Sequence, residues 1–121
     1  MRSRWKSSII AAAVIASVSS AWGQGGQALF PGAGAETCIH VLLRYAANPK
    51  FAEAYYFSWA QGFMSATNLA DSQARGVSRD FRALTVEHQQ NYLRKYCDDH
   101  PSAPYYEAVA HLYVSLDVLK K

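Results

Sequence analysis

The chain has 121 residues, of which 50% are hydrophobic and 17% are charged. This length fits one small domain and excludes a large multidomain enzyme, and so high an apolar fraction excludes a disordered tail. Twelve Lys and Arg side chains against nine Asp and Glu give a formal charge of +3. A basic balance favours nucleic-acid binding, so the position of the charge matters.

Residues 1–23 have the pattern of a secretory signal peptide. Three basic residues precede position 7, an apolar run follows from residue 9 to residue 18, and small residues flank Trp22. This order is typical of a cleaved signal, and the run is about half the roughly 20 residues that a membrane span needs. We therefore expect a periplasmic or secreted protein, cut after Gly23 or alternatively after Ala21, with no stable membrane span after cleavage.

Cleavage would remove three basic residues and no acidic ones. The mature chain then carries nine basic and nine acidic side chains, so its formal charge is zero. The basic character belongs to the targeting segment, and a surface that follows phosphates loses its main support. We expect no nucleic-acid partner.

The two cysteines, Cys38 and Cys97, both lie in the mature part. An even number of cysteines in a small exported chain predicts one disulfide. Closing a loop of about sixty residues would stabilise the fold by about 4 kcal/mol in the chain-entropy model. Two free thiols or a metal pair are the alternatives, and the absence of a CxxC motif or a matching histidine pair argues against zinc.

Residues 24–35 are rich in Gly and Ala and predict a flexible leader. Residues 36–121 predict one all-α domain, because no alternating run is long enough for a sheet. A first helix is expected from about residue 36 to just before Asn48, which would cap a second helix that has Pro49 at its first position. The apolar face of the first helix comprises Cys38, Ile39, Leu42, Leu43, Tyr45 and Ala46.

The second helix, expected over residues 49–69, is apolar around most of its girth. Such a helix must be covered on several sides, so we expect a core helix, with a dimer or client surface as the alternative. For that alternative the candidates are an aromatic row and one further residue: Phe51, Tyr55, Trp59, Phe63 and Met64. A small row would admit another helix at close range, namely Ala54, Ser58, Gly62 and Ala66.

Residues 71–84 contain Gly76 and alternating charges, which predict a loop with at most one short helical turn. A third helix follows from the cap Thr85 to Pro101, with Val86, Leu93, Tyr96 and Cys97 on its buried face. Ser102 would cap a fourth helix that closes with Lys120 and Lys121 and has the stripe Tyr105, Ala108, Val109, Leu112, Leu116 and Leu119. The sequence thus predicts a small four-helix bundle tied by one disulfide, which would pin the first helix to the third.

Catalytic and metal sites find little support in the sequence. His40, His88 and His111 each have a polar i,i+3 or i,i+4 neighbour that accounts for them. The run from Asp98 to His100 holds three ligand side chains, but consecutive helical residues point in different directions. Nucleophile elbows, Walker loops and zinc-protease motifs are missing. We expect no enzymatic activity, no cofactor and no metal.

Two resemblances point to function. Thr37-Cys38 at the start of the first helix and Tyr96-Cys97-x-x-x-Pro101 before the last one resemble the HdeA/HdeB group, over residues 37–121. That resemblance implies a periplasmic acid-stress chaperone with one inter-helix disulfide, whose partners are unfolded clients and which could form a homodimer.

The middle of the chain is similar to a second group. Trp59-x-x-Gly62-Phe63-Met64, Leu93-x-x-Tyr96-x-x-x-His100-Pro101 and the segment 108–112 are similar to small periplasmic immunity proteins of type VI secretion. That resemblance implies a partner effector that the protein binds and neutralises. Members of that group commonly carry further cysteines that this chain lacks.

The chaperone alternative also has a physical basis in the charge of the mature chain. Below about pH 4 the carboxylates would be largely protonated, so nine basic side chains and four histidines would leave a charge of about +13. Self-repulsion at that charge could open the bundle or a dimer and expose the aromatic row.

Overall fold

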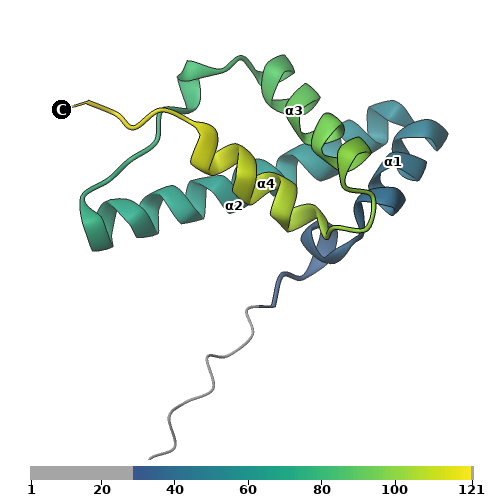
Figure 1. The fold of residues 1–121 in the computed structure, drawn as a ribbon, viewed down its shortest axis with the longest axis horizontal. Helices are drawn as coiled ribbons and strands as arrows, with labels where there is room; N and C mark the ends of the chain where they lie inside the picture. The colour runs from purple at the N-terminus through teal and green to yellow at the C-terminus, as the bar shows by residue number, and fades with distance from the viewer. Residues whose placement is uncertain (1–28, 121) are drawn as a thin grey trace, which may run out of the picture.

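The computed structural model describes residues 29–120 as four α-helices and two short 3-10 turns (Figure 1). The expected signal peptide and residues 24–28 of the leader lie outside the described residues. Within 29–120 only two isolated bridges, and no strand, accompany the helices, which confirms the all-α four-helix prediction. The elements are η1 (Gly32–Ala35), α1 (Cys38–Ala47), α2 (Pro49–Arg75), η2 (Phe81–Ala83), α3 (Val86–Asp99) and α4 (Tyr105–Ser115).

α2 is the long central helix of the fold, with α1 and α3 packed together at one of its ends and α4 crossing it (Figure 1). It begins as predicted, because the side chain of Asn48 accepts a hydrogen bond from the amide of Phe51 at 3.2 Å and Pro49 occupies the first turn. It ends at Arg75 rather than near residue 69. The ion pair of Arg75 with Asp71 supports the last turn, and Gly76, at φ 66°, closes it with a left-handed cap.

The segment between α2 and α3 is anchored to the end of α4. Arg79 donates from its guanidinium to the carbonyl oxygens of Val114 at 3.2 Å and Leu116 at 2.8 Å. These carbonyls belong to the last turn of α4, so an arginine distant in sequence caps that helix. The predicted short helical turn is present as η2. Asp80 caps it, because its side chain accepts a hydrogen bond from the amide of Arg82 at 2.9 Å.

The fourth helix is shorter than the sequence predicts, and its cap differs. α4 follows Pro104 without a side-chain cap, so the prediction that Ser102 caps it is wrong. It ends at Ser115, and the residues after it run alongside residues 78–80, with hydrogen bonds such as Leu119 amide to Ser78 carbonyl at 2.8 Å. Leu119 is therefore 40% exposed instead of extending the buried stripe.

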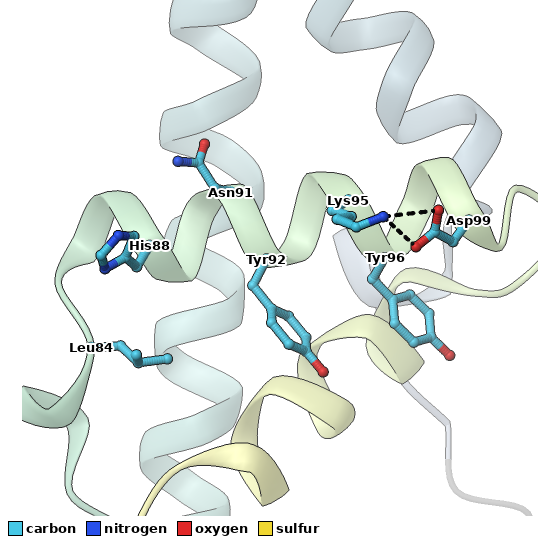
Figure 2. A pocket seen from close by; sticks show the side chains of 7 residues that line it. All are labelled: Leu84, His88, Asn91, Tyr92, Lys95, Tyr96 and Asp99. Carbon is cyan, nitrogen blue, oxygen red and sulfur yellow. Dashed lines mark hydrogen bonds and ion pairs between the residues drawn. The ribbon is translucent and has the colours of Figure 1, made fainter.

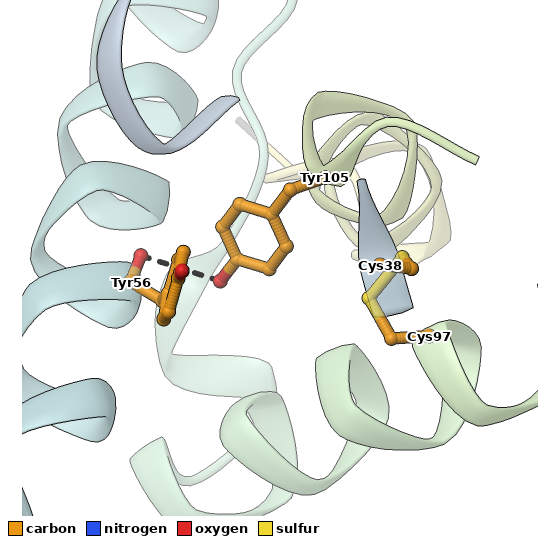
Figure 3. Close-up of a disulfide and its surroundings, with 4 residues drawn as sticks. All are labelled: Cys38, Tyr56, Cys97 and Tyr105. Carbon is orange, nitrogen blue, oxygen red and sulfur yellow. Dashed lines mark hydrogen bonds between the residues drawn. A yellow bond between two sulfur atoms is a disulfide. The ribbon is translucent and has the colours of Figure 1, made fainter. Parts of the chain in front are cut away.

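The core lies where α1, α3 and α4 meet the inner side of α2. The predicted disulfide Cys38–Cys97 joins α1 to α3 with Cα atoms 4.7 Å apart, and both cysteines are buried. Tyr105 of α4 donates to the carbonyl of Tyr56 on α2 at 3.2 Å, beside the disulfide (Figure 3). The fully buried side chains include Val41, Tyr56, Met64, Tyr105, Val109, Leu112 and Leu116.

Besides Leu119, four apolar residues that the sequence assigned to buried faces are exposed: Ile39, Leu43, Ala46 and Val86. On α1 the inward face is centred on Val41, so Ile39 and Leu43 are 46% and 58% exposed. On α3, Val86 is 52% exposed because the first turn precedes the buried positions Gln89 and Leu93. Periodicity alone predicts a wider apolar stripe than these short helices bury.

Candidate protein-binding surface on α2

The aromatic row of α2 is half exposed and half covered. Phe51 and Tyr55, in the first turns, are 53% and 40% exposed, and their rings stack with centroids 5.8 Å apart. Trp59 and Phe63 continue the row and stack at 5.3 Å, but both are half-buried. The four rings therefore form a continuous aromatic surface along α2, next to the face of the helix that packs into the core.

The covered half of the row lies beneath the N-terminal strap, as we name residues 29–35. Phe30 stacks on Tyr106 of α4 at 4.2 Å and lies 5.6 Å from the ring of Phe63. The indole nitrogen of Trp59 donates to the carbonyl of Pro31 at 3.1 Å. The prediction of a flexible leader is thus wrong for residues 29–35, which bury aromatic area against α2 and α4.

A glycine lets the strap approach this closely. A Cβ placed on Gly34 would overlap the six-membered ring of Trp59, and Gly34 itself is buried. Ala33 is 1% exposed in the core beside it. Gly32 has φ 72°, a left-handed conformation that favours glycine where the strap turns into η1. The glycines that predict a flexible leader are therefore the residues that allow the strap to pack against Trp59.

The small row of α2 faces outward. Ser58, Gly62 and Ala66 are exposed, and no atom lies within 4 Å of a Cβ built on Gly62. The described chain therefore supplies no helix for the close packing predicted there. Instead, the row borders a shallow hollow of about 390 Å³, lined by Phe30, Pro31, Ser58, Trp59, Gly62 and Phe63.

Met64, predicted as part of this surface, belongs to the core. It is 1% exposed and shares the inward row of α2 with Tyr56 and Ala60, both of which are also buried. Consecutive residues of an α-helix are rotated by about 100°, so Met64 faces the inside of the fold whereas Phe63 faces its edge. The candidate surface therefore consists of the aromatic row and the small row without Met64.

Three carboxylates attach α2 to its neighbours, and each receives a tyrosine hydroxyl and an arginine. We call them the carboxylate clusters. Glu36 accepts from Tyr56 at 2.7 Å and pairs with Arg44 at 3.3 Å. The other two clusters are Glu53 with Tyr45 and Arg94, and Asp71 with Tyr113 and Arg75.

The clusters join all four helices. Glu36 lies just before α1 and holds Tyr56 of α2, Glu53 of α2 holds Tyr45 of α1 and Arg94 of α3, and Asp71 of α2 holds Tyr113 of α4. Hydrogen bonds to an ionised carboxylate are stronger than neutral ones, so this arrangement requires the charged carboxylates.

The pKa values of the cluster residues follow from these contacts. The hydrogen bond from Tyr113, and then that from Arg75, lower the pKa of Asp71. Burial, followed by the nearby carboxylate, raises the pKa of Tyr45, Tyr56 and Tyr113. The tyrosines therefore remain hydroxyl donors across the physiological range, and the carboxylates are the members that change charge in acid.

A second hollow of about 440 Å³ lies along α3 (Figure 2). Lys95 and Asp99 form an ion pair at 2.9 Å along its edge, whereas Tyr92 and Tyr96 point toward α4. His88 and Asn91 lie toward the start of the helix. Leu84, just before α3, completes its lining.

The four histidines do not build a metal site in residues 29–120, where no group of three potential ligands comes together. His100 and His111 do approach a common neighbour, because their rings lie 4.4 Å and 5.0 Å from that of Tyr96. His40 and His88 are exposed, on α1 and α3.

Comparison with known proteins gives no relative: no protein-family model matches the chain, and no curated protein or solved structure matches it significantly. None of the helices in residues 29–120 combines the length and apolarity that crossing a membrane demands.

Two parts of this surface escape sequence reasoning. The strap has no periodicity, and only Phe30 and Pro31 amid glycines hint that it docks. The carboxylate clusters join residues up to 42 positions apart, so no local spacing announces them. Glu53 is a usable signal, since a carboxylate among the aromatic residues at the start of α2 needs a partner.

Proposed function

We propose that this protein is a non-enzymatic, exported binding protein of the chaperone type, acting in the periplasm and exposing the apolar surface of α2 in acid. The observation that carries the proposal is the set of three carboxylate clusters, which attach α2 to α1, α3 and α4. Acid protonates carboxylates, Asp71 only at a lower pH than usual because its pKa is lowered, and a protonated carboxyl no longer forms an ion pair with arginine.

Two further features support this proposal. Acid would change the formal charge of the mature chain from zero to about +13, which adds self-repulsion while the clusters weaken. The row Tyr56, Ala60 and Met64 is buried under the neighbouring helices, so opening the clusters would add it to the aromatic row. The combined surface would be wide enough for unfolded segments.

The test uses residues 24–121 with the disulfide formed. An apolar dye should bind progressively more as the pH falls from 7 to 2, and the protein should reduce light scattering when an acid-denatured enzyme is returned to neutral pH. Phe51→Ser should weaken this protection, and Val114→Ser should not, because Val114 is equally exposed at 58% but lies on α4. A dye signal that stays flat down to pH 2 would eliminate the proposal.

A second candidate, an immunity protein, is favoured by one observation. Phe51 and Tyr55 are exposed and stacked while the carboxylate clusters are intact, and the hollow beside Gly62 is open. A folded effector could dock there at neutral pH. Co-expression with the product of a neighbouring toxin gene should give a complex and protect the cell, and Gly62→Arg should abolish both effects.

A further inference from the structure

The strap, residues 29–35, covers the half of the aromatic row that is not exposed. It contacts Trp59 through the carbonyl of Pro31 and through Gly34, and Phe63 through Phe30. Phe51 and Tyr55, two turns earlier on the same side of α2, have no such cover and are the exposed half. Removing the strap would join the two halves into one aromatic surface along about three helical turns.

The strap contains no ionisable side chain, since its sequence is Leu-Phe-Pro-Gly-Ala-Gly-Ala. The next residue, Glu36, carries the only charge at its end. The amide of Glu36 donates to Ala33 at 3.2 Å, and its carbonyl accepts from the amide of Tyr105 at 2.8 Å. Its carboxylate accepts from Tyr56 at 2.7 Å and pairs with Arg44.

These contacts place Glu36 between three helices. The titratable or charged groups facing it are Arg44 of α1 and Tyr56 of α2, and α4 contributes the backbone amide of Tyr105. When the carboxylate is protonated, the ion pair with Arg44 is lost and the bond from Tyr56 becomes a weaker neutral one. The strap then has no charged contact, and it is held by aromatic stacking, by the burial of Ala33 and Gly34, by the bond from Trp59 to Pro31 and by the backbone bonds.

We propose that residues 29–35 are an autoinhibitory strap over the client-binding surface of α2, and that Glu36 is its acid-sensitive latch. This inference rests on the proposed function and assigns the regulation of the same surface. At neutral pH the strap occupies the site of Trp59 and Phe63 as a client segment would. In acid the strap detaches, and extended client segments rich in aromatic residues take its place.

The mature chain carries its own reporter for this event. Trp59 is the only tryptophan in residues 24–121, since Trp5 and Trp22 precede the expected cleavage site. Its emission wavelength and its quenching by acrylamide therefore report on the surroundings of Trp59, which are the strap, Phe63 and Tyr105 of α4. Far-ultraviolet circular dichroism, recorded on the same samples, reports on the helices.

Glu36→Gln mimics the protonated latch, and Glu53→Gln is the matched control because Glu53 also binds a tyrosine and an arginine but does not touch the strap. At pH 7 we expect Glu36→Gln to shift Trp59 emission to longer wavelength and to increase its quenching, as acid does for the unmodified protein. Glu53→Gln should match the unmodified protein at pH 7.

Equal Trp59 quenching in Glu36→Gln and the unmodified protein at pH 7, or an equal increase in Glu53→Gln, would overturn the proposal that Glu36 is the latch.

Phe30→Ala tests the strap without changing Glu36. It should expose Trp59 at pH 7 with the helical signal retained, and unchanged quenching would overturn the proposal that the strap covers the surface. Failure to protect an acid-denatured enzyme would remove the proposed function while leaving the Trp59 result valid, since no client is present in that measurement.

Discussion

The indole nitrogen of Trp59 donates a hydrogen bond to the carbonyl of Pro31, across 28 positions of sequence and 3.1 Å of space. This bond holds the Trp59 indole against the strap, where a Cβ on Gly34 would overlap its six-membered ring. The strap and the aromatic row thus pack as one unit. A substitution in either one should therefore change the packing of the other.

Gly34→Ala should destabilise the fold by about 1–3 kcal/mol, because the added methyl group would overlap the Trp59 ring and force the strap or the ring to move. Urea unfolding followed by circular dichroism measures this change. Gly62→Ala is the matched control: nothing lies within 4 Å of its Cβ, so it should stabilise α2 by about 0.5–1 kcal/mol. Equal effects of the two substitutions would contradict the described packing.

Breaking the disulfide should cost about 4 kcal/mol, because Cys38 and Cys97 close a loop with a sequence separation of 59. The double variant Cys38→Ala/Cys97→Ala should show this loss in urea unfolding at neutral pH. Reductant should lower the unfolding midpoint of the unmodified protein and leave that of the double variant unchanged. A midpoint insensitive to reductant would indicate that the bond contributes little.

Arg79→Ala should destabilise the protein by about 1.5–3 kcal/mol, because the guanidinium of Arg79 satisfies two carbonyls at the end of α4. Arg82→Ala is the control, since the side chain of Arg82 is 84% exposed and pairs only with Asp80. An exposed pair of this kind contributes under about 1 kcal/mol. Hydrogen exchange should show the loss concentrated in the last turn of α4.

Tyr113→Phe should change the pH dependence of stability. The hydrogen bond from Tyr113 lowers the pKa of Asp71, so Asp71 stabilises the folded state above its ordinary pKa of about 4 and loses that contribution as pH falls through its folded-state value. The variant should therefore have a lower urea midpoint than the unmodified protein at pH 7, and the difference should narrow toward pH 2. A constant difference would show that the charge of Asp71 has no part in it.

Much of the fold follows from local sequence. Asn48-Pro49 and Thr85 mark helix starts as predicted, because caps act on the amides of the next turn. The disulfide follows from the cysteine count together with two inward-facing helical positions. Gly76, by contrast, predicts a loop when it is read together with the charges around it. In the structure it ends α2, whose last turn is stabilised by the ion pair of Asp71 with Arg75.

The candidate site was only partly accessible to such reasoning. The aromatic row follows from i+4 spacing, but its division into exposed and covered halves depends on residues 29–35, which pack by shape and have no period. The burial of Met64 depends on which side of α2 packs against α4, and tertiary packing rather than local sequence decides this. The capping of α4 by Arg79 and the carboxylate clusters depend on contacts between residues far apart in sequence.

The disulfide has a consequence for how the molecule could open. Cys38 and Cys97 enclose α1, α2 and nearly all of α3 in a covalent ring, and the strap and α4 are tails that leave it on either side. Both tails contact the aromatic row, Phe30 of the strap against Phe63 and Tyr105 of α4 against Trp59. The strap can detach without stretching the ring, and its return requires only a short search because its point of attachment stays near its site. The proposed binding surface therefore lies within the ring, whereas the strap that covers half of it lies outside.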